Sequence, residues 1–285
     1  MNWLYFLGAI IVFYIVFAPR FAAWFYRPVL FPRLPMRSHE ASPIIAGIKG
    51  KAIYFTQSDD NRLCAWYFRN PKSIYTMLVS HGNLGNIETH NYLTEGLLKA
   101  GTSVFIYDYS GYGASTGLPD LGSVTKDAEA AYDYLVEQEQ VLAENIVLYG
   151  ESIGAAITSH LAIVRRAKAI ICQSGFISLR RIATEKIPLL YLYPDWLFPS
   201  HSLHTLNNLQ QVNVPLLIMH GEKDIVVPFS HAESLFAGAP EPKQIIAFEK
   251  RGHKDMVFGD LGYFVSTIDV FLQSLSELNT AQKSI

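Results

Sequence analysis

The fold is decided by the stretch Ile146-Val147-Leu148-Tyr149-Gly150-Glu151-Ser152-Ile153-Gly154-Ala155-Ala156. A short apolar run ends in a glycine, a serine lies between two glycines, and small apolar residues follow. This order predicts a strand, a very tight turn with Ser152 at its apex, and a helix. In such a turn the strand and the helix approach so closely that a Cβ at Gly150 or Gly154 would clash.

The pattern Gly-x-Ser-x-Gly is typical of a nucleophile elbow, in which strained backbone exposes the serine Oγ beside a helix N-terminus. Three fixed residues in five are a weak signal, and an ordinary strand-to-helix turn is the alternative. The flanks favour the elbow, because an apolar run precedes Gly150 and helix-forming residues follow Gly154. Other parts of the chain must therefore decide whether Ser152 is a nucleophile.

The composition is that of a globular chain with a sizeable core. Its 285 residues, of which 50% are hydrophobic and 13% aromatic, allow one large domain or two small ones. The net charge of −2 and the lack of a basic stripe argue against a nucleic-acid partner. Cys64 and Cys172 lie in apolar runs without metal-ligand spacing, which predicts buried thiols and offers no disulfide or zinc site.

An unbroken apolar run from Trp3 to Ala18 opens the chain. A cleaved signal peptide would carry Lys or Arg before this run, and Pro19 directly after Ala18 disfavours cleavage. A buried core helix would have a polar face, which this run lacks. We therefore expect a single transmembrane helix within residues 1–19, with aromatic residues near both of its ends.

Arginines occur only on the C-terminal side of this run. The positive-inside rule then predicts a single-pass membrane protein whose following domain lies on the cytoplasmic side. Residues 20–43 are rich in Pro and Arg and are predicted to be a juxtamembrane connector, followed by one domain over residues 44–280. The arginines that carry this prediction are Arg20, Arg27, Arg33 and Arg37.

From residue 44 onward the pattern changes from short extended pieces to alternating strands and helices. Strands are predicted at 44–48, 51–56, 63–68, 74–79, 102–107, 145–148, 168–172, 214–219 and 244–248. A polar turn at 57–61 predicts a hairpin. Helices are predicted at 87–100, 122–139, from the elbow to about 165, at 230–237 and at 254–278. This alternation predicts an α/β fold: a mostly parallel twisted sheet with helices on both faces.

Sites in such sheets form at the carboxyl ends of the strands. The strand at 74–79 is followed by Ser80-His81-Gly82-Asn83-Leu84-Gly85-Asn86, whose glycines allow backbone to approach a ligand. The backbone amides of Asn83 and Ile153 are the predicted oxyanion-hole donors, and a plain glycine-rich turn is the alternative. His81 is predicted to hold this turn.

The strands at 214–219 and 244–248 are followed by an acid and a histidine, Asp224 and His253. The chain order Ser152, Asp224, His253 is that of a hydrolase triad on a parallel sheet. Glu222 is the alternative acid. Asp108 follows the strand at 102–107 but precedes the serine, so a structural role is favoured. The histidines predicted to be surface or capping residues are His90, His160, His201, His204 and His231.

With these residues in place, the chain resembles the α/β-hydrolase superfamily. More narrowly, it resembles membrane-anchored serine hydrolases of the depalmitoylase-like and serine aminopeptidase-like branch. The resemblance covers roughly residues 40–275. Its motifs are His81-Gly82-Asn83, the loop from Asp108 to Ser115, Gly150 to Gly154, and Gly221 to Pro228. One departure is Glu151, where the depalmitoylases often have Gln.

The combined pattern predicts a serine hydrolase that cleaves carboxylic ester or thioester bonds. His253 would take the Ser152 proton, Asp224 would orient the histidine, and water would clear the acyl-enzyme. No metal or organic cofactor is implied. The expected partners are an acyl ester or thioester, with lipids and lipidated proteins among the candidates, and a membrane bound through the N-terminal helix.

An insertion over residues 176–213 separates two predicted strands and is rich in large apolar residues. It is predicted to be a small cap that contacts an acyl chain through Tyr193 and Trp196. The alternative is that these aromatic side chains pack on the sheet.

Three other functions use the same residues or the same fold. A serine aminopeptidase would need acidic residues to hold a substrate amine, and the insertion offers only Glu185 and Asp195. An acyltransferase would share the complete triad. A non-enzymatic scaffold is disfavoured, because a protein released from catalysis would normally lose at least one member of the triad.

Overall fold

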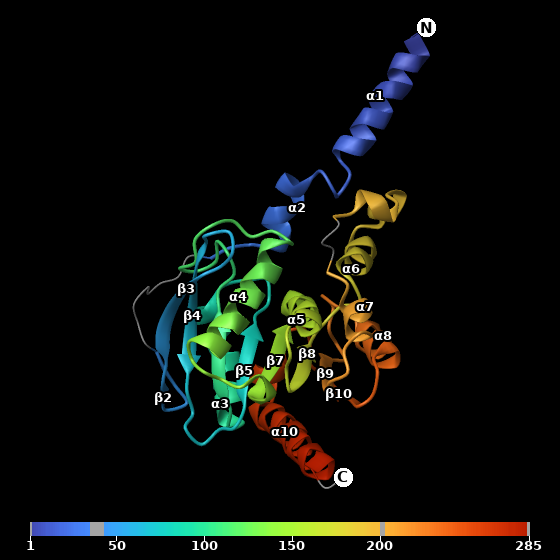
Figure 1. Cartoon of the computed structure of the whole chain (residues 1–285). Helices are drawn as coiled ribbons and strands as arrows, with labels where there is room; N and C mark the ends of the chain where they lie inside the picture. Colours follow the sequence, from blue (N-terminus) through green and yellow to red (C-terminus); the bar gives the residue numbers. More distant parts are fainter. Residues whose placement is uncertain (1, 35–42, 200–202, 284–285) are drawn as a thin grey trace.

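The centre of this computed structural model, which describes residues 2–34, 43–199 and 203–283, is an eight-stranded sheet (Figure 1). Its strands are β3 (Lys51–Thr56), β4 (Arg62–Phe68), β5 (Thr76–Ser80), β6 (Ser103–Tyr107), β7 (Ile146–Glu151), β8 (Ala169–Gln173), β9 (Leu216–Gly221) and β10 (Lys243–Phe248). The spatial order is β10-β9-β8-β7-β5-β6-β4-β3. Among these eight strands β4 alone runs in the opposite direction to the other seven, which confirms the predicted mostly parallel sheet.

Helices cover both faces of the sheet, as predicted. One face packs against α3 (Asn91–Lys99), α9 (Asp255–Gly259) and α10 (Leu261–Lys283), and the other packs against α4 (Ser123–Glu137) and α5 (Ile153–Val164). Successive side chains of a strand point to opposite faces of the sheet, so each strand contributes to two hydrophobic cores. In β5, Met77 and Val79 pack in the core beneath α3, α9 and α10, and Leu78 packs in the core beneath α4 and α5. Beside α5, α7 (Thr205–Leu209) and α8 (Ser230–Gly238) pack over β8 and β9.

The topology reverses at β5, and this reversal positions the site. From β5 the chain moves to β6 on one side of the sheet and then returns to β7 on the other side. The loops that leave the carboxyl ends of β5 and β7 therefore lead in opposite directions along the sheet, which is where ligands bind in folds of this kind. These are the loops that contain Asn83 and Ser152.

Two predicted elements differ from the observed ones. The predicted strand at 44–48 is a separate small hairpin of β1 (Ile44–Ile45) and β2 (Ile48–Lys49), because Ala46 and Gly47 adopt positive φ angles and reverse the chain. The predicted helix at 254–278 is divided into α9 and α10. The side chain of Asp260 accepts a hydrogen bond from the Tyr263 amide at 3.0 Å, so Asp260 starts a new helix.

The N-terminal apolar run forms α1 (Asn2–Val16), whose side chains lack a polar face. Among residues 2–34, 43–199 and 203–283, no helix is long and apolar enough to cross a membrane, so the predicted transmembrane helix is not supported. The 15 residues of α1 span about 22 Å at 1.5 Å per residue, against a hydrocarbon core of about 30 Å. The chain turns shortly before Pro19, which cannot continue the hydrogen bonding of a helix. Arg37 lies outside the described residues.

Candidate active site

The predicted elbow is present between β7 and α5. Ser152 has a φ of +56° and a ψ of −116°, a strained conformation for a residue with a side chain. A Cβ at Gly150 would meet the carbonyl oxygen of Gly154, and a Cβ at Gly154 would meet that of Ser80. The clash expected from the sequence is therefore real, and it explains why both flanking positions are glycines.

The three predicted triad residues meet at the carboxyl edge of the sheet. His253 Nε2 lies 3.0 Å from Ser152 Oγ, and His253 Nδ1 lies 2.7 Å from Asp224 Oδ2. The imidazole side chain is 11% exposed and Ser152 is 9% exposed, so the site is nearly closed to bulk water but still accessible. This arrangement can remove a proton from Oγ and hold it on the imidazole.

Asp224 is held as an ionised acceptor. Its Oδ1 accepts hydrogen bonds from the amides of Val226 and Val227, both at 2.8 Å. Burial by itself would raise the pKa of Asp224, but the hydrogen bonds from His220, His253 and the backbone outweigh burial and hold that pKa well below its usual range. The carboxylate therefore stays charged and can stabilise a protonated His253.

His220 is a member of the site that the sequence interpretation missed. Its side chain is fully buried, and its Nε2 donates to the carbonyl oxygen of Val227 at 2.8 Å while lying 3.1 Å from Asp224 Oδ2. His220 thus holds the loop that carries the acid. The signal was its position at the end of a predicted strand, which is the criterion that identified the other candidates.

The predicted oxyanion donors lie on either side of the elbow. Ile153 begins α5, and Asn83 lies in the turn after β5, where its carbonyl oxygen accepts a 2.8 Å hydrogen bond from the Tyr112 hydroxyl. Within the described part of the chain, neither the Asn83 amide nor the Ile153 amide donates a hydrogen bond. Both amides are therefore free to bind a ligand oxygen.

The two alternative acids lie outside the triad. Asp108 is fully buried and its Oδ1 accepts from the Ile87 amide at 2.9 Å, so its predicted structural role in the loop is confirmed. Glu222 is exposed. Of these three acids, only Asp224 hydrogen-bonds the His253 ring among the residues that the structure describes.

Some predictions for the remaining histidines are wrong. His231 is buried, so its predicted surface or capping position is wrong. His90 is also buried and not on the surface, but it occupies the N-cap position of α3, which agrees with the capping alternative. His231 Nδ1 accepts from the Ile177 amide at 3.0 Å and its Nε2 donates to Glu185 at 2.9 Å. Helical position alone could not distinguish these inward-facing side chains from surface ones. His201 lies outside the described residues.

The insertion consists of α6 (Leu179–Lys186), the short 3-10 helices η3 (Pro188–Leu192) and η4 (Asp195–Leu197), and α7. The ring of Tyr193 stacks on Tyr14 of α1 with centroids 4.6 Å apart, and Trp196 is 64% exposed. No hydrogen bond or ring contact joins either aromatic side chain to the triad in the part of the chain that the structure describes. Their role in substrate binding stays a prediction.

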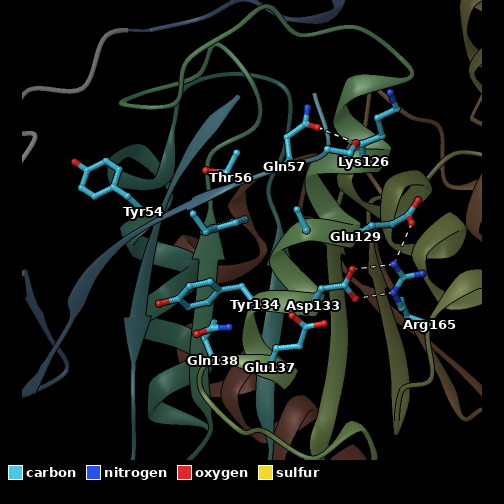
Figure 2. Close-up of a pocket in the computed structure, with 13 residues that line it drawn as sticks. Tyr54, Thr56, Gln57, Lys126, Glu129, Asp133, Tyr134, Glu137, Gln138 and Arg165 are labelled. Carbon is cyan, nitrogen blue, oxygen red and sulfur yellow. Dashed lines mark hydrogen bonds and ion pairs between the residues drawn. The ribbon is translucent and has the colours of Figure 1, made fainter. Parts of the chain in front are cut away.

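A cavity of about 510 Å³ lies elsewhere, between β3 and α4 (Figure 2). None of the triad residues lines it. Most of its charged side chains are paired within the chain: Arg165 bonds Asp133 at 2.7 and 2.8 Å and lies 3.3 Å from Glu129. Lys126 binds Asp59 at 2.8 Å. We assign no function to this cavity.

Comparisons with known proteins agree with this fold and site. The family "Serine aminopeptidase, S33" matches residues 70–205. The uncharacterized protein YfhR of Escherichia coli K12 is 31% identical over 244 residues, which span 80% of this chain and 83% of that protein. Human alpha/beta hydrolase domain-containing protein 17B is 33% identical over 201 residues, which span 70% of this chain and 67% of that protein. The chain therefore belongs to the α/β-hydrolase superfamily.

A solved structure shows the same fold at lower sequence identity. The Pyrococcus furiosus esterase Pf2001 superposes with a TM-score of 0.70 at 20% identity and covers 85% of this chain and 97% of its own. Family and fold together support an enzyme of the hydrolase class.

Proposed function

We propose that this protein is a serine hydrolase that cleaves carboxylic ester or thioester bonds of acyl-chain substrates. The observation that carries the proposal is the hydrogen-bonded sequence Ser152–His253–Asp224, with distances of 3.0 and 2.7 Å. Nucleophile, base and acid come from three different loops. They meet at one edge of the sheet, with the mutual hydrogen bonds that nucleophilic catalysis requires.

In the proposed mechanism His253 Nε2 takes the Ser152 proton as Oγ attacks the acyl carbonyl carbon. The Asn83 and Ile153 amides bind the resulting oxyanion, each contributing about 3 kcal/mol to the transition state. Protonated His253 then gives its proton to the leaving alcohol or thiol. A water molecule, deprotonated by the same imidazole, releases the acid and regenerates Ser152.

A fluorophosphonate probe tests this proposal directly. The wild-type protein should be labelled, and Ser152→Ala should lose all labelling while keeping its circular dichroism spectrum. Ser266→Ala, which changes an exposed serine of α10, is the control, and it should be labelled. Failure of the folded wild-type protein to react would instead favour a scaffold without enzymatic activity.

The proposed substrate class carries a long acyl chain, because the insertion exposes large apolar side chains. If Tyr193 and Trp196 contact this chain, replacing either by Ala should lower kcat/KM for long-chain esters far more than for acetate esters. Leu142→Ala, which changes a 58% exposed side chain elsewhere, is the control. Equal losses on short and long esters would contradict a role in acyl-chain binding.

We further propose that α1 binds a lipid surface and brings the enzyme to lipid or lipidated-protein substrates. Support comes from its exposed apolar side chains, which include Ile10, Ile11 and Phe13, and from the absence of any acidic residue in the described stretch 2–34. Placement of the domain on the cytoplasmic side remains the expectation from the arginine distribution.

Sedimentation with vesicles containing anionic lipid tests this binding. Ile11→Asp should reduce the bound fraction of the full chain, because a charge on an apolar helix face opposes insertion. Leu142→Asp is the control outside α1. Equal binding of both variants would exclude α1 as the lipid-binding element.

An aminopeptidase reaction has less support, although the matching family bears that description. Both acidic residues of the insertion already have partners: Glu185 pairs with Arg181 and His231, and Asp195 pairs with Arg180. Neither carboxylate is left over for a substrate amine. An acyltransferase with the same triad would be detected by adding alcohol acceptors and analysing the products.

A further inference from the structure

Glu151, the residue before Ser152, is a fully buried carboxyl that the proposed mechanism does not use. Both of its oxygens lie within hydrogen-bond distance of the Tyr92 hydroxyl, at 3.0 and 3.1 Å. Its Oε2 also lies 3.5 Å from His90 Nε2. A buried carboxyl next to a nucleophile is costly unless its surroundings compensate for the lost hydration.

The tautomer of His90 follows from its hydrogen bond. His90 Nδ1 lies 2.8 Å from the carbonyl oxygen of Asn86, and because a carbonyl oxygen can only accept, Nδ1 carries the proton. Burial lowers the pKa of His90 to about 3, so the ring is neutral at ordinary pH. Its Nε2 therefore presents a lone pair to Glu151, and these two atoms attract each other only if a proton lies between them.

Burial likewise raises the pKa of Glu151 above its ordinary value, and nearby Lys254 only partly offsets this effect. His90 Nε2 is buried and has no hydrogen-bond partner among the described residues, and at 3.5 Å a protonated Glu151 needs only a small approach to donate to it while still accepting from the Tyr92 hydroxyl. An ionised Glu151 would place a negative charge against the lone pair of His90.

The pair formed by Glu151 and His90 lies directly beneath the oxyanion turn. A Cβ added to Gly82 would be 3.6 Å from His90 Nε2 and 3.7 Å from the carboxyl carbon of Glu151. His90 Nδ1 binds the Asn86 carbonyl at the end of the turn. His81, whose ring centroid is 4.8 Å from that of His90, donates from Nδ1 to the Gly82 carbonyl at 2.7 Å.

The Gly82 carbonyl belongs to the same peptide group as the Asn83 amide, so its hydrogen bond fixes the direction of that amide. We propose that Glu151 is a positioning residue that shares one proton with His90 and thereby keeps the turn from Gly82 to Asn86 in the conformation that binds the oxyanion. This inference rests on the proposed function for its kinetic consequence. Loss of the shared proton to hydroxide at alkaline pH would loosen the turn and lower kcat.

Other ionisable groups also face this pair and must be distinguished from it. Tyr92 comes from α3, Tyr149 from β7, His81 from the turn after β5, and His253 and Lys254 from the loop after β10. An alkaline loss of activity that arises from one of these other groups does not depend on Glu151. That loss would persist when Glu151 is changed, whereas a loss that arises from Glu151 would not.

Glu151→Gln is the decisive variant, because a carboxamide can donate to His90 Nε2 and accept from Tyr92 without titrating. The kcat of the wild type on an acyl ester should fall at alkaline pH with the slope of one ionisation, and Glu151→Gln should keep its plateau. Glu151→Met, which cannot hydrogen-bond, should have a low kcat and a nearly unchanged KM at every pH. An alkaline limb that is the same in Glu151→Gln and wild type would overturn the proposal.

A second measurement does not depend on activity. The folded state holds the Glu151 proton more tightly than the unfolded chain, so the protonated carboxyl stabilises the folded state. This stabilisation is complete below the pKa of Glu151 in the unfolded chain and is lost as pH rises through its pKa in the folded state. The unfolding free energy of Glu151→Gln minus that of the wild type should therefore increase from acidic to alkaline pH. A pH-independent difference would refute the shared proton, whereas loss of fluorophosphonate labelling in the wild type would refute only the proposed function.

Discussion

The carboxyl edge of the sheet and the N-terminal region are held together in different ways. At the sheet edge, polar side chains are buried and bonded from several loops, as Asp224 is by His253 and by two backbone amides. In Figure 1, α1 projects away from the sheet, with the insertion at its foot. It is joined there by the Tyr14–Tyr193 stack and by the hydrogen bond from the Arg20 amide to Leu197. Single changes should therefore have large effects at the sheet edge and small effects near α1.

The largest effect is expected for Asp224→Asn. An amide in place of the carboxylate would favour the wrong tautomer of His253, so kcat should fall by about 10⁴-fold while the protein keeps its fold. Glu222→Gln, which alters the exposed alternative acid two residues away, should retain nearly full activity. Comparable losses in both variants would show that the acid of the triad is misassigned. Ester hydrolysis measured at saturating substrate makes the comparison.

Replacing one glycine by alanine in each region compares the two regions directly. Gly154→Ala should destabilise the protein by about 3 kcal/mol, because the new Cβ meets the Ser80 carbonyl oxygen. Gly8→Ala adds the same group to α1, where nothing lies within 4 Å, and should not reduce stability. Denaturant titration measures both changes. A tolerated Gly154→Ala would mean that the elbow is less tightly packed than its geometry indicates.

The pH dependence of stability should also differ between the regions. Hydrogen bonds keep the pKa of Asp224 below its unfolded value, so its stabilisation is present above that unfolded value and is lost as pH falls through the folded pKa. Wild type should lose about 2 kcal/mol relative to Asp224→Asn between mildly and strongly acidic pH. Ile11→Ala in α1 should leave the pH profile unchanged. A constant offset between Asp224→Asn and wild type would contradict a depressed pKa.

The smallest effect is expected for Tyr14→Ala. It removes the stack on Tyr193 and the 2.5 Å hydrogen bond to the Leu192 carbonyl, but at a largely exposed contact. We expect about 1 kcal/mol of lost stability and unchanged hydrolysis of short esters. Thermal unfolding and acetate ester assays check this outcome. A large loss of short-ester activity would show that α1 supports the site more strongly than its contacts indicate.

Much of the site could be predicted because of a property of parallel sheets. Ser152, Asp224 and His253 each follow a predicted strand, and the carboxyl ends of parallel strands share one edge. Histidines within helical segments could not be assigned in this way, because a helical position does not say whether a side chain faces inward. For this reason the burial of His231 and His90 was not predicted, and His220 was overlooked although it lies in β9 at the end of a predicted strand.

The N-terminal prediction shows the opposite case. Apolar composition correctly predicted a helix in residues 2–16 but suggested a span that the observed 15-residue length does not support. Composition carries no information about where a helix stops or what it touches. The stack between Tyr14 and Tyr193 joins residues far apart in the chain, and no local pattern predicts it.

The sequence by itself determined the alternating fold, the elbow at Ser152 and the chain order of the candidate triad, because these depend on local periodicity and on glycines that close approach requires. The tertiary structure decided that His253 lies between Ser152 and Asp224, that His220 contacts Asp224, and that Glu151 and His90 meet beside the turn that begins at Gly82. Those pairings depend on how buried side chains from separate strands and helices pack together, and on which nitrogen of each imidazole is left to face a carboxyl group.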